Sequence, residues 1–293
     1  MVRIKPSTIW QASKLNRFLP FLLPECRSIH AARQELRWIQ DESNDDYQVW
    51  KRCKLRYRHY PLQYILGSQP FESLNIKCKP GVLIPRWETE EWATDLAHRL
   101  PKNRQIHVLD LCTGTGCIPL LIKHIRPDAV VKAVDCSPLA TGLAYWNSKS
   151  LGISIQVIQG DILEHNSTVK PQKVDLITCN PPYISQSTFV KETSRSVKLF
   201  EPKLALIGCF EFYADLIDHQ ISRAEAFVYE VGELSQCEYV CRRIVEDPIL
   251  SKVWRVGFRL DANSKPRVVY GYRRVAITLD WPRIFEEFGE LKN

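Results

Sequence analysis

The chain has 293 residues, of which 45% are hydrophobic and 25% charged, so it can bury a sizeable core. This length predicts one large domain and one smaller one. A net charge of +7 is compatible with a polyanionic partner without requiring one. The ten cysteines form no CxxC pair and have no zinc-finger spacing, which predicts reduced thiols and no metal site. No apolar run reaches the ~18 residues of a membrane-spanning helix, so none is expected.

The first 24 residues are basic and contain no acidic residue. Their basic residues are Arg3, Lys5, Lys14 and Arg17, with hydroxyl side chains between them. This composition is typical of a mitochondrial transit segment. An ordinary first helix of the small domain would have the same composition, and both interpretations stay open at this point.

Two amphipathic helices are predicted next. Ser28 can cap a helix over 28–42, whose apolar residues recur on one face. A helix over 46–60 repeats the pattern with Trp50, Cys53, Tyr57 and Tyr60. Its other face is basic, and we expect either a solvated face or a docking surface for an acidic or polyanionic partner, formed by Lys51, Arg52, Lys54, Arg56 and Arg58.

A connector rich in proline and glycine follows over 61–85, with one strand expected at 71–78 and a hairpin-like shape. From residue 105 strands and helices alternate. Strands are expected at 106–112, 129–135, 153–159, 174–179, 226–231, 254–260 and 267–274. Alternation of this kind predicts an α/β fold, with a parallel sheet covered by helices on both faces.

A glycine loop follows the first of these strands and opens a helix. Because Pro119 stands at the third glycine position, the loop is not a dinucleotide fingerprint, and it lacks the Gly-Lys-Ser/Thr of a P-loop. Asp135 ends the next strand, where a carboxylate can accept from ribose hydroxyls. Asp161 ends the third strand and can accept from an adenine amine. These features predict a nucleoside-cofactor site that includes Cys112, Thr113, Gly114, Thr115 and Gly116.

The strongest signal lies at the end of the fourth predicted strand, where the chain reads Asn180-Pro181-Pro182-Tyr183. Two prolines remove two backbone donors, so the turn presents carbonyl oxygens, and Asn180 adds one from its side chain. Such an acceptor cradle suits a planar NH₂ group, against which the ring of Tyr183 can stack. It would aim the nitrogen lone pair at a methyl donor and stabilise the charge that develops during transfer.

Over roughly residues 25–275 the chain resembles the release-factor glutamine N5-methyltransferases, the PrmC/HemK family. The motifs that carry the resemblance are Pro61–Gly67 with Phe71, Gly81–Glu90, Asp110–Gly116, Asn180–Tyr183, Glu201-Pro202, Glu230-x-Gly232 with Gln236, and Arg267-Val-Val. The family implies a Rossmann-like class I methyltransferase sheet with an antiparallel last strand and a small helical N-terminal domain. It also implies S-adenosylmethionine as the methyl donor.

The resemblance implies that the substrate is the glutamine of a Gly-Gly-Gln motif in a class I release factor. The family's cofactor residues match Cys112–Gly116, Asp135, Ile162 and Asn180, and its glutamine-holding residues match Asn180–Tyr183. With the acid-free N-terminus, the presence of an N-terminal domain favours the mitochondrial branch, and hence the mitochondrial release factor as partner. We expect a monomer that makes no direct sequence-specific contact with nucleic acid.

We divide the chain on this basis into a helical docking domain (1–69), a hairpin-like connector (70–90), the methyltransferase domain (91–280) and a C-terminal tail (281–293). The chain departs from the family pattern at three positions: Trp87 replaces a proline, Cys112 a glycine, and Ile162 an aromatic residue found in some members. Cys112 should narrow the loop, and stacking on adenine at Ile162 is not expected.

Two other functions fit parts of the pattern. The Asn-Pro-Pro-Tyr cradle also suits the N6 amine of a flipped adenine, as in nucleic-acid amine methyltransferases. Those enzymes add basic, aromatic-rich recognition segments, whereas residues 61–90 resemble the protein-methylating family. A non-enzymatic platform would be expected to lose the cofactor loop or Asn180, and both are intact.

Overall fold

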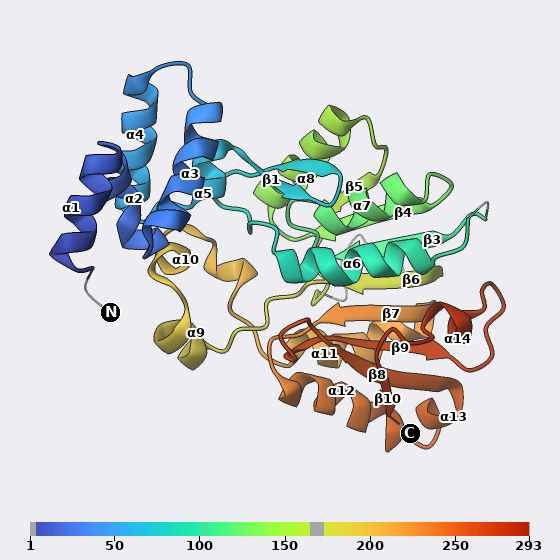
Figure 1. The fold of residues 1–293 in the computed structure, drawn as a ribbon. Helices are drawn as coiled ribbons and strands as arrows, with labels where there is room; N and C mark the ends of the chain where they lie inside the picture. Colours follow the sequence, from blue (N-terminus) through green and yellow to red (C-terminus); the bar gives the residue numbers. More distant parts are fainter. Residues whose placement is uncertain (1–3, 103, 165–172, 293) are drawn as a thin grey trace.

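The computed structural model describes residues 4–102, 104–164 and 173–292. Its N-terminal part is a helical bundle whose apolar side chains pack around Leu22 and Ile39, both fully buried. In Figure 1 this bundle, in blue, lies to one side of the sheet. Its helices are α1 (Pro6–Leu15), α2 (Leu19–Cys26), α3 (Ile29–Asp41), α4 (Asp46–Tyr57) and α5 (Leu62–Leu66).

The third and fourth helices agree with the prediction, with one correction. Ser28 caps α3 by accepting from the backbone N–H of Ala31 at 3.1 Å. On α4, however, the buried face consists of Val49 and Cys53. Of the apolar face predicted from the sequence, Cys53 is buried, whereas Trp50 and Tyr57 are 37% and 54% exposed. The reason is tertiary: the side of α4 that faces the bundle core is the one that carries Val49 and Cys53, in the same cluster as Leu22 and Ile39.

The predicted basic face of α4 is divided. Arg56 turns inward, where its guanidinium donates to both carboxylate oxygens of Glu35 at 2.8 and 2.9 Å. Arg52 donates to the carbonyl of Glu42 and to the hydroxyl of Ser43. Lys51 and Arg58 are exposed. The basic run therefore contributes partly to the internal stability of the bundle and partly to its surface.

A two-stranded hairpin joins the bundle to the rest of the molecule. It is formed by β1 (Ser68–Phe71) and β2 (Leu74–Lys77), which pair antiparallel. The single strand predicted at 71–78 is therefore wrong. The chain turns at Glu72, whose φ is 52°. The side chain of Asn147 accepts from the N–H of Lys77 at 3.0 Å and donates to its carbonyl at 3.2 Å. These two bonds fix the hairpin to α8 (Pro138–Leu151).

The described residues form an eight-stranded sheet in the order β10-β8-β9-β7-β6-β3-β4-β5. From β5 to β7 all neighbours are parallel, whereas β9 is antiparallel to both of its neighbours and β10 to β8. The expectation of a purely parallel sheet is therefore wrong at this edge, and the antiparallel last strand implied by the family resemblance is present. The strands are β3 (His107–Leu111), β4 (Val130–Asp135), β5 (Gln156–Gln159), β6 (Val174–Cys179), β7 (Ala224–Glu230), β8 (Trp254–Leu260), β9 (Pro266–Arg273) and β10 (Glu290–Lys292).

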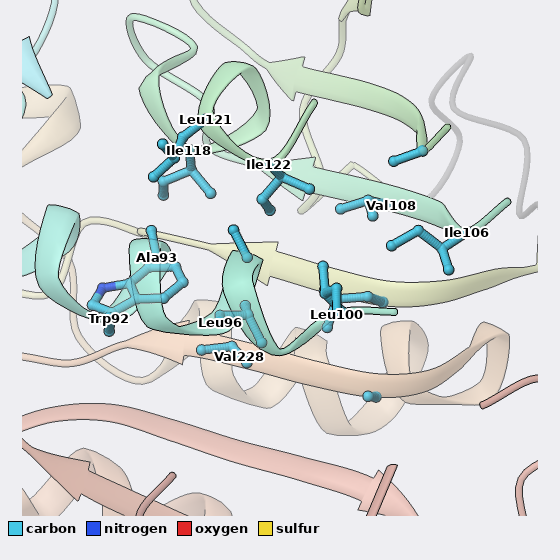
Figure 2. Packing of buried hydrophobic residues seen from close by; sticks show 14 of the residues in the cluster. Trp92, Ala93, Leu96, Leu100, Ile106, Val108, Ile118, Leu121, Ile122 and Val228 are labelled. Carbon is cyan, nitrogen blue, oxygen red and sulfur yellow. The ribbon is translucent and has the colours of Figure 1, made fainter. Parts of the chain in front are cut away.

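Helices cover both faces of the sheet. On one face α6 (Trp87–Arg99) and α7 (Cys117–Ile125) meet around Trp92, Leu96 and Ile122 (Figure 2). On the other, α11 (Glu211–Asp215), η2 (Leu216–Gln220) and α12 (Leu234–Val245) cover the sheet. The remaining segments are α9 (Gln186–Glu192), α10 (Arg195–Phe200), η1 (Lys203–Ala205), η3 (Ile221–Arg223), α13 (Leu250–Val253) and α14 (Trp281–Ile284).

The C-terminal segment packs on the sheet. Trp281, Phe285 and Phe288 are buried in the same cluster as α6 and α7. The ring of Phe285 stacks on that of Tyr270, and β10 then adds a strand to the sheet edge. Across the described part of the chain, no helix combines the length and the apolar character needed to cross a membrane.

Candidate functional site

The carboxyl ends of β3, β4 and β6 open into a cleft with an empty volume of about 1090 Å³, counting its open mouth. Residues 81–86, the first part of the Gly81–Glu90 motif, form one wall of the cleft. Ala205 and Phe212 contribute to another wall. Most of the predicted cofactor residues line this cleft: Cys112, Thr113, Gly114, Thr115, Asp135, Asp161, Ile162 and Asn180, together with Pro182. This is the location expected for a ligand in an open α/β sheet.

The glycine loop is held in the left-handed region at three positions, with φ values of 55° at Cys112, 56° at Gly114 and 81° at Gly116. A Cβ on Gly114 would meet no atom within 4 Å, so the loop leaves open space facing the cleft. A Cβ on Gly116 would lie 3.1 Å from that of Ala144. Gly116 therefore allows α7 and α8 to pack closely and does not line the cleft.

The two acidic residues at the strand ends, Asp135 and Asp161, both line the cleft. Asp135 accepts from the N–H of Gly114 at 2.8 Å with one carboxylate oxygen and from that of Ser137 at 2.9 Å with the other. Burial raises the pKa of Asp135, and these two backbone bonds oppose the rise. Each oxygen keeps a free lone pair for a ribose hydroxyl. Asp161 accepts from the N–H of Leu163 at 2.9 Å, beside the buried side chain of Ile162.

Asp110 lies at the end of β3, next to the loop, and is completely buried. The hydroxyl of Thr178 donates to one of its oxygens at 2.6 Å. Among the described residues the other oxygen forms no hydrogen bond of good geometry, although the hydroxyl of Thr113 lies near enough to lower the pKa of Asp110. Burial raises the pKa of Asp110 to about 7. The carboxyl group of Asp110, next to the loop, therefore keeps its proton to a higher pH than an exposed aspartate does.

A second cavity adjoins the first and is lined by Tyr183, Gly232 and Arg267, with residues of α9 and α10 on its far side. Leu83, Arg86, Asn180 and Ala205 line both cavities. Asn180 therefore stands at the junction between a cofactor-sized cleft and a separate pocket. A molecule bound in the cleft and a side chain bound in the second pocket could therefore meet at Asn180.

Tyr183 forms a wall of the second cavity and is fixed at both ends. Its hydroxyl donates to Glu230 at 3.1 Å, and its backbone carbonyl accepts from the side-chain amide of Gln236 at 2.9 Å. A Cβ on Gly232 would lie 2.6 Å from the tyrosine ring, so only glycine allows the ring to occupy this position. The ring thus has a fixed orientation before any substrate arrives.

The two prolines of the motif are buried. Pro182 lines the cofactor cleft, whereas Pro181 lines neither cavity. The carbonyl oxygen of Pro182 lies 2.2 Å from where a Cβ on Gly208 would stand, so this carbonyl packs against that glycine. The acceptor role expected for the carbonyl of Pro181 therefore stays a prediction, whereas Asn180 lines both cavities.

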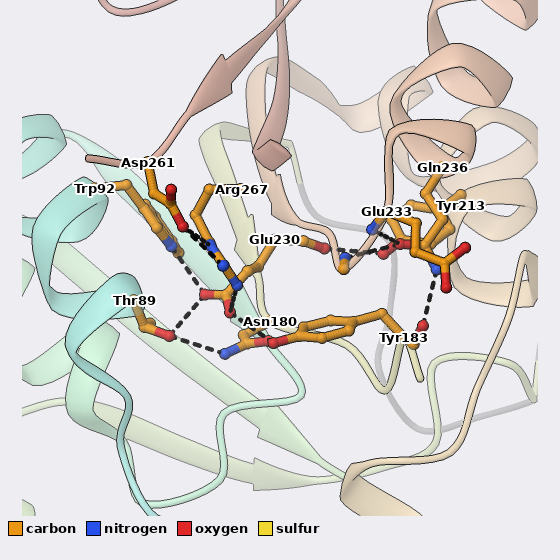
Figure 3. A network of polar contacts seen from close by, with 11 residues as sticks. Thr89, Trp92, Asn180, Tyr183, Tyr213, Glu230, Glu233, Gln236, Asp261 and Arg267 are labelled. Atoms are coloured by element: carbon orange, nitrogen blue, oxygen red, sulfur yellow. Dashed lines mark hydrogen bonds and ion pairs between the residues drawn. The ribbon is translucent and has the colours of Figure 1, made fainter. Parts of the chain in front are cut away.

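Behind the cradle lies Glu230, which is completely buried and accepts three hydrogen bonds (Figure 3). The hydroxyl of Thr89 donates at 2.7 Å and the indole N–H of Trp92 at 2.9 Å, both to Oε2, while Tyr183 donates to Oε1. Arg267 lies 4.0 Å from Oε1. Burial raises the pKa of Glu230, and its hydrogen-bond donors and this guanidinium oppose the rise.

Arg86 closes the wall shared by the two cavities. Its guanidinium donates to Glu201 at 2.8 and 2.9 Å, and the N–H of Ile84 donates to the same carboxylate at 3.2 Å. The carboxylate of Glu201 is almost fully buried, with 2% of its side chain exposed. These bonds tie residues 84–86 to Glu201, directly after α10, although the two segments lie more than a hundred positions apart in the sequence.

No individual role was predicted from the sequence for the residues that support the cradle: Thr89, Trp92, Glu201, Glu230 and Arg267. Most of them belong to motifs that carried the family resemblance. Glu201, Glu230 and Arg267 could have been suspected of a buried polar role, because each is a polar residue within such a motif next to apolar neighbours. The sequence could not show that these residues meet, because the bond between Thr89 and Glu230 joins positions 141 apart.

Comparison with known proteins agrees with this geometry. Residues 77–199 match the family model "Methyltransferase small domain". The fold is similar to that of the hMettl16 catalytic domain in complex with an RNA hairpin, with a TM-score of 0.55, 13% identity and 94% of each chain covered. At this identity the likeness concerns the fold alone.

Two curated relatives match over most of their length. The mitochondrial MRF1 N(5)-glutamine methyltransferase of Saccharomyces cerevisiae is 40% identical, with 100% of this chain and 96% of the relative covered. A probable MRF1 mitochondrial N(5)-glutamine methyltransferase of Schizosaccharomyces pombe is 36% identical, covering 87% and 93%. A release factor glutamine methyltransferase of Moorella thermoacetica is 38% identical over about half of each chain. The chain therefore belongs to the glutamine N(5)-methyltransferase family that includes the two yeast proteins.

Proposed function

We propose that this chain transfers the methyl group of S-adenosylmethionine to the side-chain amide of the glutamine in the Gly-Gly-Gln motif of a mitochondrial class I release factor. The observation that carries the proposal is the position of Asn180. It lines both the cofactor cleft and the adjoining cavity walled by Tyr183, so it lies where a donor and a planar amide would meet.

The residues of the first cleft fit the cofactor. Asp135 would hold the ribose hydroxyls, Asp161 the adenine amine, and Ile162 would offer an apolar surface to the ring. The open space at Gly114 leaves room for the amino-acid portion. S-adenosylmethionine supplies an electrophilic methyl group on a sulfonium centre. The role of the protein is to place a weak nucleophile in line with that methyl group.

On the acceptor side, the amide nitrogen of glutamine is a poor nucleophile because its lone pair is delocalised. The side-chain carbonyl of Asn180 and the backbone carbonyl of Pro181 would accept its two hydrogens and favour density on nitrogen. Tyr183 would stack on the amide plane. Burial beside Glu230 raises the pKa of the Tyr183 hydroxyl, so this group stays protonated and cannot act as a base. The surplus proton would leave after methyl transfer.

The acid-free N-terminal segment and the mitochondrial names of both yeast relatives support action in mitochondria. We propose a monomer without sequence-specific nucleic-acid contacts, divided into a helical domain (1–69), a connector (70–90), a methyltransferase domain (91–280) and a C-terminal segment (281–293). The exposed Lys51 on α4 and Arg58, directly after this helix, would help dock the release factor. Reversing these two charges should raise the KM for the release factor and leave kcat unchanged. An unchanged KM would count against docking at this surface.

The test is methyl transfer from labelled S-adenosylmethionine to a purified mitochondrial release factor, with the modified residue mapped by mass spectrometry. We expect one methyl group, on the Gly-Gly-Gln glutamine. Asn180→Ala should lower kcat about 100- to 1000-fold, the usual effect of losing one preorganised polar contact. Cofactor affinity, measured by calorimetry, should change by less than about threefold, because one contact at the cleft's edge contributes little binding energy.

Label on nucleic acid instead of on the release factor would contradict the proposed substrate and favour an adenine amine as acceptor. Cofactor binding without label on any acceptor would favour a non-enzymatic role. Equal rates for the wild type and Asn180→Ala would show that the glutamine is held elsewhere.

A further inference from the structure

The carboxamide of Asn180 has two orientations, and only one presents an oxygen to the acceptor. Its Nδ2 lies 3.2 Å from the hydroxyl oxygen of Thr89, which is itself 2.7 Å from Oε2 of Glu230 (Figure 3). Thr89 and Glu230 are 1% and 0% exposed, so water does not compete for these bonds.

The three hydrogen-bond donors to Glu230 and the nearby guanidinium of Arg267 favour the ionised form of this carboxylate. In that form Oε2 accepts from the indole N–H of Trp92, which can only donate. The hydroxyl of Thr89 must then donate its single proton to the same oxygen. The Thr89 oxygen has only lone pairs left for Asn180, which must therefore present its NH₂ group.

We propose that Glu230, acting through Thr89, sets the orientation of the Asn180 carboxamide so that Oδ1 is left to accept the substrate amide. Within the described ranges no hydrogen bond uses Oδ1. Thr89 and Glu230 are thus positioning residues. This inference rests on the proposed function and extends it, because it explains how an amide that is symmetric in shape becomes an acceptor on one side only.

The orientation matters because a flipped Asn180 would direct two N–H groups at the two hydrogens of the substrate amide. The cradle would then repel the group that it must hold. Trp92 makes the arrangement robust, since its indole cannot reverse its role as a hydroxyl can. Thr89 and Trp92 lie on α6, Asn180 follows β6, and Glu230 ends β7. The sheet and the helix must therefore be correctly packed before Asn180 is oriented.

The test compares Thr89→Val with Thr89→Ser, since valine keeps the shape of threonine and serine keeps its hydroxyl. Thr94→Val is the matched control, because Thr94 lies on the same helix and its buried hydroxyl has no hydrogen-bond partner within the described structure. We expect Thr89→Val to lower kcat about 10- to 100-fold, as misorientation of a reacting group does. KM for the release factor and cofactor affinity should change little, Thr89→Ser should recover most of the rate, and Thr94→Val should match the wild type.

A second readout does not depend on the substrate. The side-chain NH₂ resonances of Asn180, assigned by their absence in Asn180→Ala, should report one hydrogen-bonded proton in the wild type and in Thr89→Ser, and none in Thr89→Val. Unchanged Asn180 resonances in Thr89→Val would overturn the inference, as would equal kcat values for the valine and serine variants of an active enzyme. A wild type that binds cofactor but does not modify glutamine would contradict the proposed function alone, and the resonances would still decide the orientation.

Discussion

The two halves of the site each contain a completely buried carboxylate, and the two are held differently. Asp110, on the donor side, receives one hydrogen bond, from Thr178. Glu230, on the acceptor side, receives three and lies near Arg267. Burial raises the pKa of both groups, to about 7 for Asp110. A buried carboxylate with few donors tends to take up a proton, whereas one with several donors and a nearby cation is favoured as an anion.

The difference reflects what each half must hold. The donor side is shaped mainly by backbone, with the loop in the left-handed region at Cys112, Gly114 and Gly116. Its ligand is bound by groups that follow directly from the chain path. The acceptor side is shaped by side chains, and their orientation depends on a connected set of hydrogen bonds. We therefore expect backbone changes to affect the first half and removal of a polar group to affect the second.

The largest effect is expected from Glu230→Met, which keeps the approximate shape and removes the acceptor. Thr89, Trp92 and Tyr183 would lose the acceptor of their hydrogen bonds, and Arg267, which keeps its ion pair with Asp261, would lose a nearby anion. The free energy of unfolding should fall by about 3–5 kcal/mol, the usual result of breaking a buried charged network. Denaturant unfolding followed by circular dichroism measures this. A loss below about 1 kcal/mol, the size expected for an exposed ion pair, would mean that the network is not a major source of stability.

Asp135→Asn tests the donor side. Its two oxygens both accept backbone N–H groups, and an asparagine would direct its own NH₂ group at one of them. The Kd for S-adenosylmethionine should rise about 10- to 100-fold, the equivalent of a charge-assisted hydrogen bond. At saturating cofactor, kcat should stay close to that of the wild type, in contrast to Asn180→Ala. Calorimetry with steady-state kinetics separates these two effects. A fall in kcat with an unchanged Kd would show that Asp135 contributes to methyl transfer and not to cofactor binding.

Asp110→Asn should differ from the wild type in how its free energy of unfolding depends on pH. The folded-state pKa of Asp110, about 7, lies above that of an unfolded aspartate, so the folded chain keeps a proton that the unfolded chain releases. Stability from this group is therefore complete below pH ~4 and is lost as the pH rises to about 7, by at most ~1.4 kcal/mol per pH unit. The variant lacks this loss, so its stability relative to the wild type should increase from pH 4 to 7 and then level off.

Equilibrium unfolding of both proteins at several pH values checks the difference, and other titrating groups cancel in the comparison. A constant difference between pH 4 and 7 would indicate that Asp110 is ionised in the folded protein throughout that range.

The smallest effect is expected from Cys112→Gly. Cysteine at a φ of 55° carries a left-handed penalty of ~1–2 kcal/mol, and glycine would relieve it. The greater freedom of glycine in the unfolded chain opposes this gain by ~0.5–1 kcal/mol. The net result should be a stabilisation below about 1 kcal/mol, visible as a small rise in Tm. A clear fall in Tm would show that the Cys112 side chain contributes packing that outweighs the strain.

The sequence by itself determined the parts of the molecule in which the functional residues are neighbours in the chain. The glycine loop, Asp135 and the Asn-Pro-Pro-Tyr motif all follow directly from strands, and parallel strands bring their carboxyl ends to one edge. The alternation of strands and helices could also be predicted, because strands and helices differ in the periodicity of their apolar residues. The hairpin was anticipated in shape, but its two short strands were read as one.

Only the tertiary structure decided which side chains meet across long separations. The buried face of α4 depended on how Val49 and Cys53 fit the bundle, and the inward turn of Arg56 on the position of Glu35. The contact between Thr89 and Glu230 depended on α6 packing over the end of β7. No local pattern carries such information, because a hydrogen bond between distant residues is fixed by packing. For this reason the residues that orient Asn180 could be recognised only once the sheet and its helices were in place.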